Sequence, residues 1–298
     1  MNPLEFFDHI QHHIQYQTLN LNANLTVTIK RLDQIHPHIS GNKFFKLKYN
    51  FHVAQQQGLK NVLTFGGAYS NHIAATAYAA HALGFKSVGV IRGEELAHRP
   101  LNKTLTLAAQ LGMQFHFVSR EQYRQRHQAE YLSALTKKFP EYFIIPEGGS
   151  NALALQGTKE ILSPDDLKHY DVICCAVGTG GTIAGLIETS SAQQMVLGFS
   201  ALKGDFLQRD IQQWTQKKNW QLCNAYVGAG YAKTTPELLS FMRDFELQHH
   251  IPLEQIYTAK MMMGLLDLIQ QNYFPQGSRI LVIHTGGLQG RIADPDQT

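Results

Sequence analysis

Charged residues are scarce in this chain of 298 residues: 16% are Asp, Glu, Lys or Arg, against the usual quarter. Gln, Asn and His supply much of the polarity instead. The formal net charge is +3, and no dense run of Lys or Arg occurs. Because nucleic-acid-binding domains present clustered basic charge, the sequence predicts no nucleic-acid partner.

Cysteine is also rare, and long apolar runs are absent. Cys174 and Cys175 lie in an apolar segment, so buried reduced thiols are expected rather than a disulfide framework. No apolar stretch is long enough to predict a membrane span. The first residues lack the pattern of a signal peptide, so we expect a cytoplasmic protein. The histidines are scattered rather than set at metal-ligand spacing, and no metal site is predicted.

Strand-like and helix-like segments alternate along most of the sequence, at a spacing of roughly thirty residues. This pattern is typical of right-handed βαβ units, so we predict an α/β fold with parallel sheets and helices on both faces. The predicted strands are 25–29, 61–65, 87–91, 114–118, 142–145, 171–177, 195–199 and 280–283. The predicted helices include 42–57, 73–83, 102–111, 121–138, 183–189, 236–249 and 258–271.

The segment Ser40-Gly-Asn-Lys-Phe-Phe-Lys46 reads as a helix start with a lysine in its first turn. Ser40 or Asn42 is expected to cap the helix. The dipole at a helix N-terminus disfavours the ammonium form of Lys43, and a neutral lysine is what Schiff-base chemistry needs. Lys43 and Lys46 share one face, and taken alone that face also fits a solvated basic surface.

Gly178-Thr-Gly-Gly-Thr182 follows a buried strand and begins a helix. A backbone with few side chains can wrap an anion, with its N–H groups and the helix dipole directed at it. The loop matches neither the P-loop nor the dinucleotide-binding fingerprint. A terminal phosphate of a small cofactor is the interpretation we favour, and a plain tight turn is the alternative.

Three further polar segments follow predicted strands or precede helices. They are Gly66-Gly-Ala-Tyr-Ser70-Asn71-His72, Tyr257-Thr258, and His284-Thr285-Gly-Gly287. Polar side chains at the carboxyl edge of a parallel sheet often contact a ligand. Helix capping by Ser70 or Asn71, and packing of Tyr257, are the alternatives for each segment alone.

In this order and at these separations, the five motifs resemble those of the fold-type II pyridoxal-phosphate (PLP) enzymes, which have a tryptophan synthase β-like fold. Within them the chain resembles the 1-aminocyclopropane-1-carboxylate (ACC) deaminase/D-cysteine desulfhydrase family over essentially its whole length. The resemblance implies a homodimer and two α/β domains. Residues 1–45 plus 151–298 would form the large PLP-binding domain, and 46–150 a small inserted domain.

The resemblance also implies residue roles. Lys43 would form a Schiff base with PLP and move protons at the substrate α-carbon, and Lys46 would contact the phosphate. Asn71 would bond the ring hydroxyl, while Ser70 with its neighbours Asn71 and His72 would bind the substrate carboxylate. The implied catalytic residues are Lys43, Ser70, Tyr257 and Tyr231, and the other implied cofactor contacts are Gly178, Thr179, Gly180, Gly181, Thr182, Thr258 and Thr285.

The substrate implied is a small amino acid. ACC deaminases carry Glu after the tyrosine that matches Tyr257, and an apolar residue at the position of Thr285. Thr258 and Thr285 resemble the desulfhydrase branch instead, which favours elimination from D-cysteine to pyruvate, ammonia and hydrogen sulfide. Tyr69 stands where desulfhydrases usually carry Gln, so ACC deaminase stays an alternative. A non-catalytic protein that binds a phosphorylated ligand is a further one.

Overall fold

The computed structural model describes residues 2–11, 14–21, 23–202, 204, 206–228, 230 and 233–292. Its contacts divide the chain into two compact units. The first comprises residues 1–12 and 36–157, and the second comprises residues 13–35 and 158–298. Within the described residues, no helix is long and apolar enough to cross a membrane.

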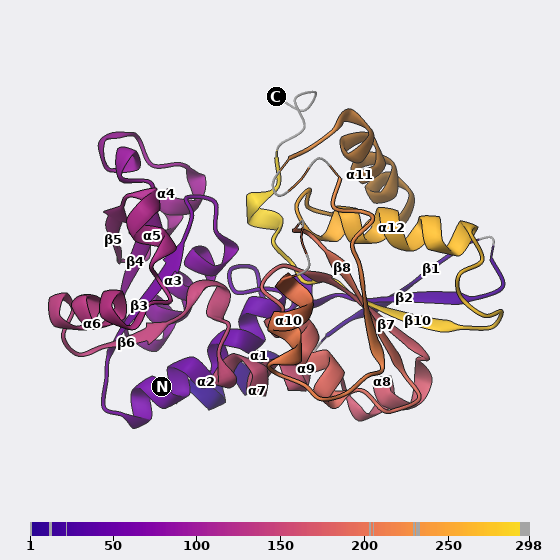
Figure 1. Ribbon diagram of the computed structural model, residues 1–298, viewed down its shortest axis with the longest axis horizontal. Coiled ribbons are helices and arrows are strands. Elements are labelled where there is room, and N and C mark those ends of the chain that lie inside the picture. Colours follow the sequence, from indigo (N-terminus) through magenta and orange to yellow (C-terminus); the bar gives the residue numbers. More distant parts are fainter. Residues whose placement is uncertain are drawn as a thin grey trace. The chain divides into compact units, whose positions relative to one another are not determined.

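The first unit contains a four-stranded parallel sheet in the order β5-β4-β3-β6 (Figure 1). Its strands are β3 (Asn61–Gly66), β4 (Lys86–Arg92), β5 (Met113–Val118) and β6 (Tyr142–Ile145). Its helices are α1 (Pro3–Gln11), α2 (Asn42–Gln56), α3 (Asn71–Leu83), α4 (Lys103–Gln110), α5 (Arg120–Arg124), α6 (Ala129–Lys138) and α7 (Ala152–Thr158), with short 3-10 turns η2 (Glu94–His98) and η3 (Glu147–Gly149).

Both faces of this sheet are covered because its strands carry apolar side chains on alternating sides. Leu63, Val88 and Val90 pack with α5 and α6 in one cluster. Ile91 and Met113 pack with α3 and α4 in another. The predicted helices on both faces are therefore confirmed for this unit.

The second unit contains a six-stranded sheet in the order β1-β2-β10-β7-β8-β9. All neighbouring strands are parallel except β1 and β2, which are antiparallel. Its strands are β1 (Tyr16–Leu19), β2 (Thr26–Lys30), β7 (Val172–Val177), β8 (Met195–Ser200), β9 (Trp220–Cys223) and β10 (Arg279–Ile283). Its helices are α8 (Pro164–His169), α9 (Gly181–Thr189), α10 (Phe206–Gln212), α11 (Pro236–His249) and α12 (Thr258–Gln270), with the 3-10 turns η1 (Leu32–Gln34), η4 (Lys159–Ile161) and η5 (Leu288–Gly290).

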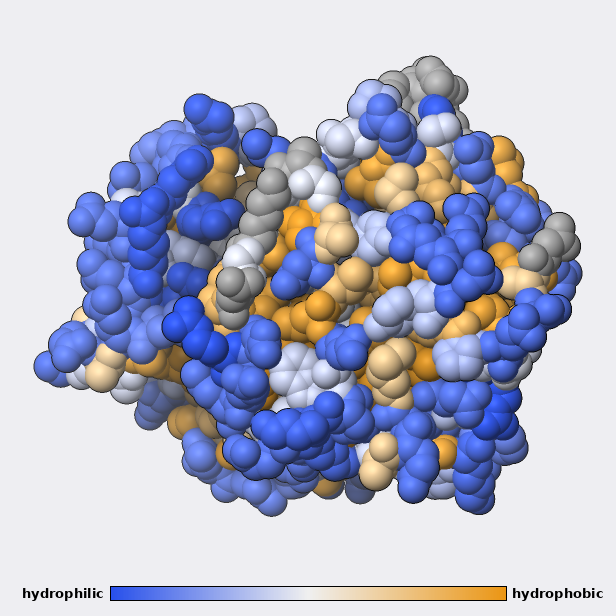
Figure 2. Space-filling model, turned by 45° about the vertical axis from the view of Figure 1, so that its right-hand side comes forward, coloured by the Kyte–Doolittle hydropathy of each residue, from blue (hydrophilic) through white to orange (hydrophobic). Residues whose placement is uncertain are grey.

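Helices α11 and α12 cover one face of this sheet and form an apolar cluster with β2, β7 and β10. Some apolar side chains on the two helices remain partly exposed, among them Leu239, Phe241, Met263, Leu266 and Ile269. Figure 2 shows apolar surface among the polar surface of the face that it presents. The central strand β7 is buried along its full length, as its continuous apolar run predicts.

One predicted helix is divided in the structure, and two short elements were not predicted. The helix expected at 121–138 is two helices, α5 and α6, which are separated by residues 125–128. Strand β1 and helix α8 were not predicted, since four- and six-residue elements carry little periodic signal. The Ser163-Pro164 start of α8 is nevertheless a readable signal, because Ser163 forms a capping box with Asp166.

The observed units also differ in extent from the predicted domains. Residues 1–12 and 36–45 group with the four-stranded sheet rather than with the larger unit. The cause is the packing of α1 on α2: the rings of Phe7 and Phe44 lie 5.0 Å apart, and Lys48 Nζ pairs with Asp8 Oδ1 at 2.5 Å. The assignment of the units as a cofactor domain and an inserted domain stays a prediction.

Candidate active site

Helix α2 begins without a side-chain cap. The N-cap residue is Gly41, with φ 66° and ψ −152°, and it has no side chain with which to cap the helix. The expected capping by Ser40 or Asn42 is therefore wrong, because the chain enters the helix through a conformation that only glycine adopts readily. Lys43 follows in the first turn, is half-buried, and donates from Nζ to Asn42 Oδ1 at 3.0 Å.

Lys46 lies one turn further on and is almost completely buried, with 1% of its surface exposed. Its ammonium donates to Gly148 O at 3.1 Å and to Ser150 Oγ at 3.0 Å. Burial holds the pKa of Lys46 well below its usual value, and the nearby charge of Lys43 acts in the same direction. The alternative of a solvated basic helix face is wrong for Lys46.

The loop that holds Lys46 is itself fixed by a carboxylate that the sequence analysis missed. Glu147 accepts from Tyr123 OH at 2.6 Å and from Arg126 Nε at 2.6 Å. The residue that follows Glu147 provides the carbonyl bonded by Lys46. A glutamate directly before Gly148 was the available signal, but its partners lie more than twenty residues away in the chain.

Ser70 ends the connection between β3 and α3, and Asn71 is the first residue of α3, close to the predicted turn. Ser70 is the N-cap of α3, and its Oγ accepts from Ile73 N at 3.3 Å. A Cβ at Gly66 would stand 2.4 Å from Ile73 Cγ1, so only glycine fits at the start of this turn. Within the described residues, Asn71 Oδ1 is buried and has no hydrogen-bond partner. Such an oxygen costs free energy unless a ligand supplies a donor.

His72 is buried with a defined tautomer. Thr64 Oγ1 donates its proton to Ile145 O at 2.9 Å, so His72 Nε2, 2.8 Å from Thr64 Oγ1, must carry a proton and donate it. His72 Nδ1 is then an acceptor, and no partner for it exists within the described part of the chain. Burial, followed by the charges of Lys43 and Lys46, holds the pKa of His72 well below its usual value. The ring is therefore neutral.

In the second unit, the glycine loop lies between the end of β7 and the start of α9. Gly180 is the N-cap of α9 with φ 79°, and the helix start has no side-chain cap. A Cβ at Gly178 would stand 3.0 Å from Tyr257 Cε1. The structure therefore brings together two of the predicted motifs, the glycine loop and Tyr257. The helix N-terminus that follows the loop can face an anion.

Thr258 and Tyr257 begin α12, where a buried glutamate organises the backbone. Glu254 is 1% exposed, and its carboxylate accepts from the N–H groups of Ile256, Tyr257 and Thr258 at 2.7 to 2.8 Å. Thr258 Oγ1 accepts from Glu254 N at 2.9 Å, and the threonine is fully buried. Glu254 was missed, although an acidic residue just before a helix is a recognisable start signal.

Thr285 follows β10, as predicted, and is 9% exposed. The two residues after it, Gly286 and Gly287, have φ 74° and 91°, which lie in the left-handed region. The preceding His284 is buried and bonded to backbone groups on both ring nitrogens. Tyr231, predicted as a second active-site tyrosine, lies outside the described residues.

Comparison with known proteins assigns these features to a family. Residues 12–286 match the model of the pyridoxal-phosphate dependent enzymes. The chain is 32% identical to the bifunctional D-cysteine desulfhydrase/1-aminocyclopropane-1-carboxylate deaminase of Arabidopsis thaliana, over 90% of this chain and 74% of that protein. It is 26% identical to D-cysteine desulfhydrase of Klebsiella pneumoniae, over 98% and 93% of the two chains. A crystal structure of an ACC deaminase homologue matches with a TM-score of 0.81 at 26% identity, over 94% and 91% of the two chains.

The residues present fit the cofactor of that family. In the first unit, the buried Asn71 Oδ1 can accept from a ring hydroxyl. In the second unit, the glycine loop presents backbone N–H groups at a helix start, and a side chain at Gly178 would fill the space beside Tyr257. The predicted cofactor and fold are thus confirmed. The chain belongs to the PLP-dependent enzymes of fold type II, in the ACC deaminase/D-cysteine desulfhydrase family.

Proposed function

We propose that this enzyme catalyses α,β-elimination from D-cysteine, which yields pyruvate, ammonia and hydrogen sulfide. The observation that carries the substrate proposal is the pair Thr258 and Thr285, where ACC deaminases have Glu and an apolar residue. The carboxylate nearest to Thr258 in sequence is that of Glu254. It accepts hydrogen bonds from three backbone N–H groups at the start of α12. The names of the Arabidopsis and Klebsiella relatives support the same activity.

Bound PLP supplies an aldehyde that attaches the substrate amine and a conjugated ring that stabilises negative charge at the α-carbon. Lys43 is proposed to hold the cofactor covalently and then to take the α-proton through Nζ. Departure of the thiolate from the β-carbon leaves an enamine, which water converts to pyruvate and ammonia. Lys43 is half-buried and its Nζ is bonded to Asn42. Both features restrict the movement of the amine, which supports this role.

The other predicted residues are proposed to orient the reactants. Asn71 Oδ1 accepts from the ring hydroxyl, and Ser70 with the N–H groups of Asn71 and His72 binds the substrate carboxylate. Neutral His72 adds an acceptor on Nδ1 without adding charge. Lys46 and residues 178–182 are proposed to hold the phosphate, and Thr258 and Thr285 the ring, with Tyr257 and Tyr231 beside the reacting atoms.

Borohydride reduction of the PLP-loaded protein, followed by peptide mapping, tests the role of Lys43. We expect one reduced adduct, on Lys43, and none in K43A, while K60A, at an exposed lysine, labels like the wild type. An adduct on another lysine would overturn the assignment.

Release of ammonia from D-cysteine, L-cysteine and ACC tests the substrate. We expect turnover of D-cysteine with sulfide and pyruvate in equal amounts. Turnover of ACC alone would replace the proposal with the ACC deaminase alternative, which the bifunctional name of the Arabidopsis relative also favours.

Two further properties are part of the proposal. A cytoplasmic location and a homodimer are proposed from the sequence and from the family resemblance. The mass of the purified protein in solution, measured by light scattering, distinguishes a dimer from a monomer.

A further inference from the structure

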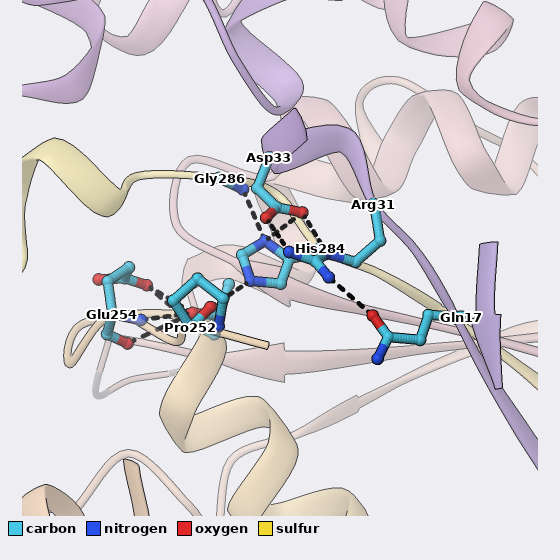
Figure 3. A network of polar contacts seen from close by, with 8 residues as sticks. Gln17, Arg31, Asp33, Pro252, Glu254, His284 and Gly286 are labelled. Atoms are coloured by element: carbon cyan, nitrogen blue, oxygen red, sulfur yellow. Dashed lines mark hydrogen bonds and ion pairs between the residues drawn. The ribbon is translucent and has the colours of Figure 1, made fainter. Parts of the chain in front are cut away.

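A chain of buried polar side chains lies at the carboxyl ends of β2 and β10 in the second unit (Figure 3). Arg31 donates from Nε and Nη2 to the two oxygens of Asp33, at 2.9 and 2.7 Å, and from Nη1 to Gln17 Oε1 at 2.8 Å. The side chains of Arg31 and Asp33 are 4% and 1% exposed. Because a bidentate pair has one preferred geometry, Asp33 is held in a fixed position.

His284 lies beside Asp33 and is also 1% exposed. Its Nε2 is 2.8 Å from Pro252 O, which can only accept, so Nε2 carries a proton. Its Nδ1 accepts from Gly286 N at 3.3 Å, so Nδ1 carries none. Burial lowers the pKa of His284, although Asp33 acts against this effect. The neutral ring therefore satisfies two backbone groups from two separate segments.

Asp33 Oδ1 stands 3.4 Å from the same Nδ1, and as an acceptor it can bond this nitrogen only when Nδ1 carries a proton. A protonated ring would donate from Nδ1 to Asp33, and the Gly286 N–H would lose this acceptor. The bond from Nε2 to Pro252 O persists in both forms, whereas the bond from the Gly286 N–H to Nδ1 exists only in the neutral form. A proton on Nδ1 would therefore exchange the bond from the Gly286 N–H for a bond to Asp33, which Arg31 holds in place.

The two segments joined by His284 carry residues proposed to contact the cofactor. Thr285 lies between His284 and Gly286, in the turn after β10. Pro252 begins the segment in which Glu254 fixes the N–H groups of residues 256–258, and Tyr257 is among these. One imidazole thus spans from the turn of Thr285 to the segment of Tyr257.

We propose that His284 is a positioning residue, whose neutral imidazole fixes the turn of Thr285 relative to the segment of Tyr257. Its effect on the cofactor rests on the proposed roles of these two residues. No part of the reaction passes through the imidazole itself, since both of its nitrogens are bonded to the backbone.

Two substitutions separate the two bonds, and a third removes both. H284N keeps an acceptor near the place of Nδ1 but does not reach Pro252, while H284Q places an amide donor near the place of Nε2 and lacks the acceptor. H284F keeps a ring and loses both bonds. H169N, at an exposed histidine in α8, is the matched control.

Amide hydrogen exchange of the cofactor-free variants measures directly how firmly the turn of Thr285 and the segment of Tyr257 are held. We expect H284N to speed exchange of the amides at 254–258 roughly fivefold and to leave 286–287 near wild type. H284Q should show the opposite pattern. Equal protection of both segments in H284N and H284Q would overturn the proposal, and this comparison does not require H284F to fold.

The effect of His284 on the bound cofactor is measured by the absorption spectrum at saturating PLP and by the dissociation constant for PLP. We expect a shifted spectrum and affinity weaker by on the order of tenfold in H284F, with partial recovery in H284N and H284Q. Unchanged spectra and affinities together with a lower melting temperature would show a merely structural role and overturn the proposal. A wild-type protein that binds no PLP would instead refute the proposed function, and the exchange result would still stand.

Discussion

At the scale of single residues, three polar groups in the first unit have environments that cost stability. Lys46 is buried with its ammonium on a carbonyl and a hydroxyl, while Asn71 Oδ1 and His72 Nδ1 lack partners within the described residues. Unsatisfied buried groups are rare in folded proteins and are concentrated at functional sites. Within the described residues, His52 Nδ1, Thr76 Oγ1 and the Tyr131 hydroxyl of the same unit also lack partners, so what favours a polar ligand is that Asn71 and His72 are adjacent at the start of α3.

Substitution of Asn71 by alanine should separate stability from binding. Because the buried Oδ1 has no protein partner, N71A should unfold at the same temperature as the cofactor-free wild type or above it. Its affinity for PLP should fall by about tenfold, through loss of one hydrogen bond. Thermal unfolding and fluorescence titration measure the two effects. A large loss of stability in the cofactor-free variant would contradict this account.

Because His72 is buried and resists protonation, the protein should lose stability as the pH falls. The unfolded histidine takes up a proton below its ordinary pKa of 6.5, whereas the buried ring resists protonation until well below that value. Stability is therefore fully present above about pH 6.5 and is lost as the pH falls below it. H72Q, which keeps an N–H donor for Thr64, should lose about 1 kcal/mol less than the wild type between pH 7.5 and 5.5. Urea unfolding at both pH values checks this, and equal losses would exclude His72 as the source.

At the scale of elements, close backbone approaches decide where helices can pack. Gly157 in α7 lies directly against α2: a Cβ there would stand 1.9 Å from Phe45 O. The same helix α2 carries both lysines of the candidate site. The position of the lysines therefore depends on a glycine more than a hundred residues away in the chain.

G157A should be strongly destabilising, since the clash is with backbone that cannot rotate away. We expect a loss of about 3 kcal/mol or more, measured by denaturant unfolding. G67A is the control, because a Cβ at Gly67 meets only Arg92 Nη2 at 3.7 Å, and it should change stability by about 0.5 kcal/mol or less. Equal stability of the two variants would show that α7 can shift without cost.

At the scale of the whole molecule, each of the two units contains its own sheet and its own predicted motifs. The lysines and the serine–asparagine turn belong to the first unit, and the glycine loop, Tyr257 and Thr285 belong to the second. Binding of PLP should stabilise the folded chain as a whole by mass action.

Loading with PLP should raise the melting temperature by several degrees at a hundredfold excess over the dissociation constant, where the gain is about 2.7 kcal/mol. K43A should show a smaller rise, because only the non-covalent contacts remain. Differential scanning calorimetry with and without PLP makes the comparison. An identical rise in K43A and wild type would argue against covalent attachment at Lys43.

Much of this fold was predictable because its signals are local. Strand β6 and helix α11 begin and end where the sequence predicts, and Ser70 caps α3 as expected. The burial of Lys46 was not predictable, since its partners Gly148 and Ser150 lie 102 and 104 positions away. The contact of His284 with Pro252, 32 positions away, was equally invisible. Tertiary partners, rather than helix or strand propensity, set these environments.

The pairing of β2 with β10 has a consequence for synthesis on the ribosome. It joins residues 26–30 to residues 279–283, so the middle of the six-stranded sheet cannot close until nearly all of this sequence has emerged. Residues 36–157 are continuous and hold the whole four-stranded sheet, so they can fold much earlier. During that interval β2 lacks its parallel neighbour, and its antiparallel partner β1, next to it in sequence, can cover one of its edges from the start.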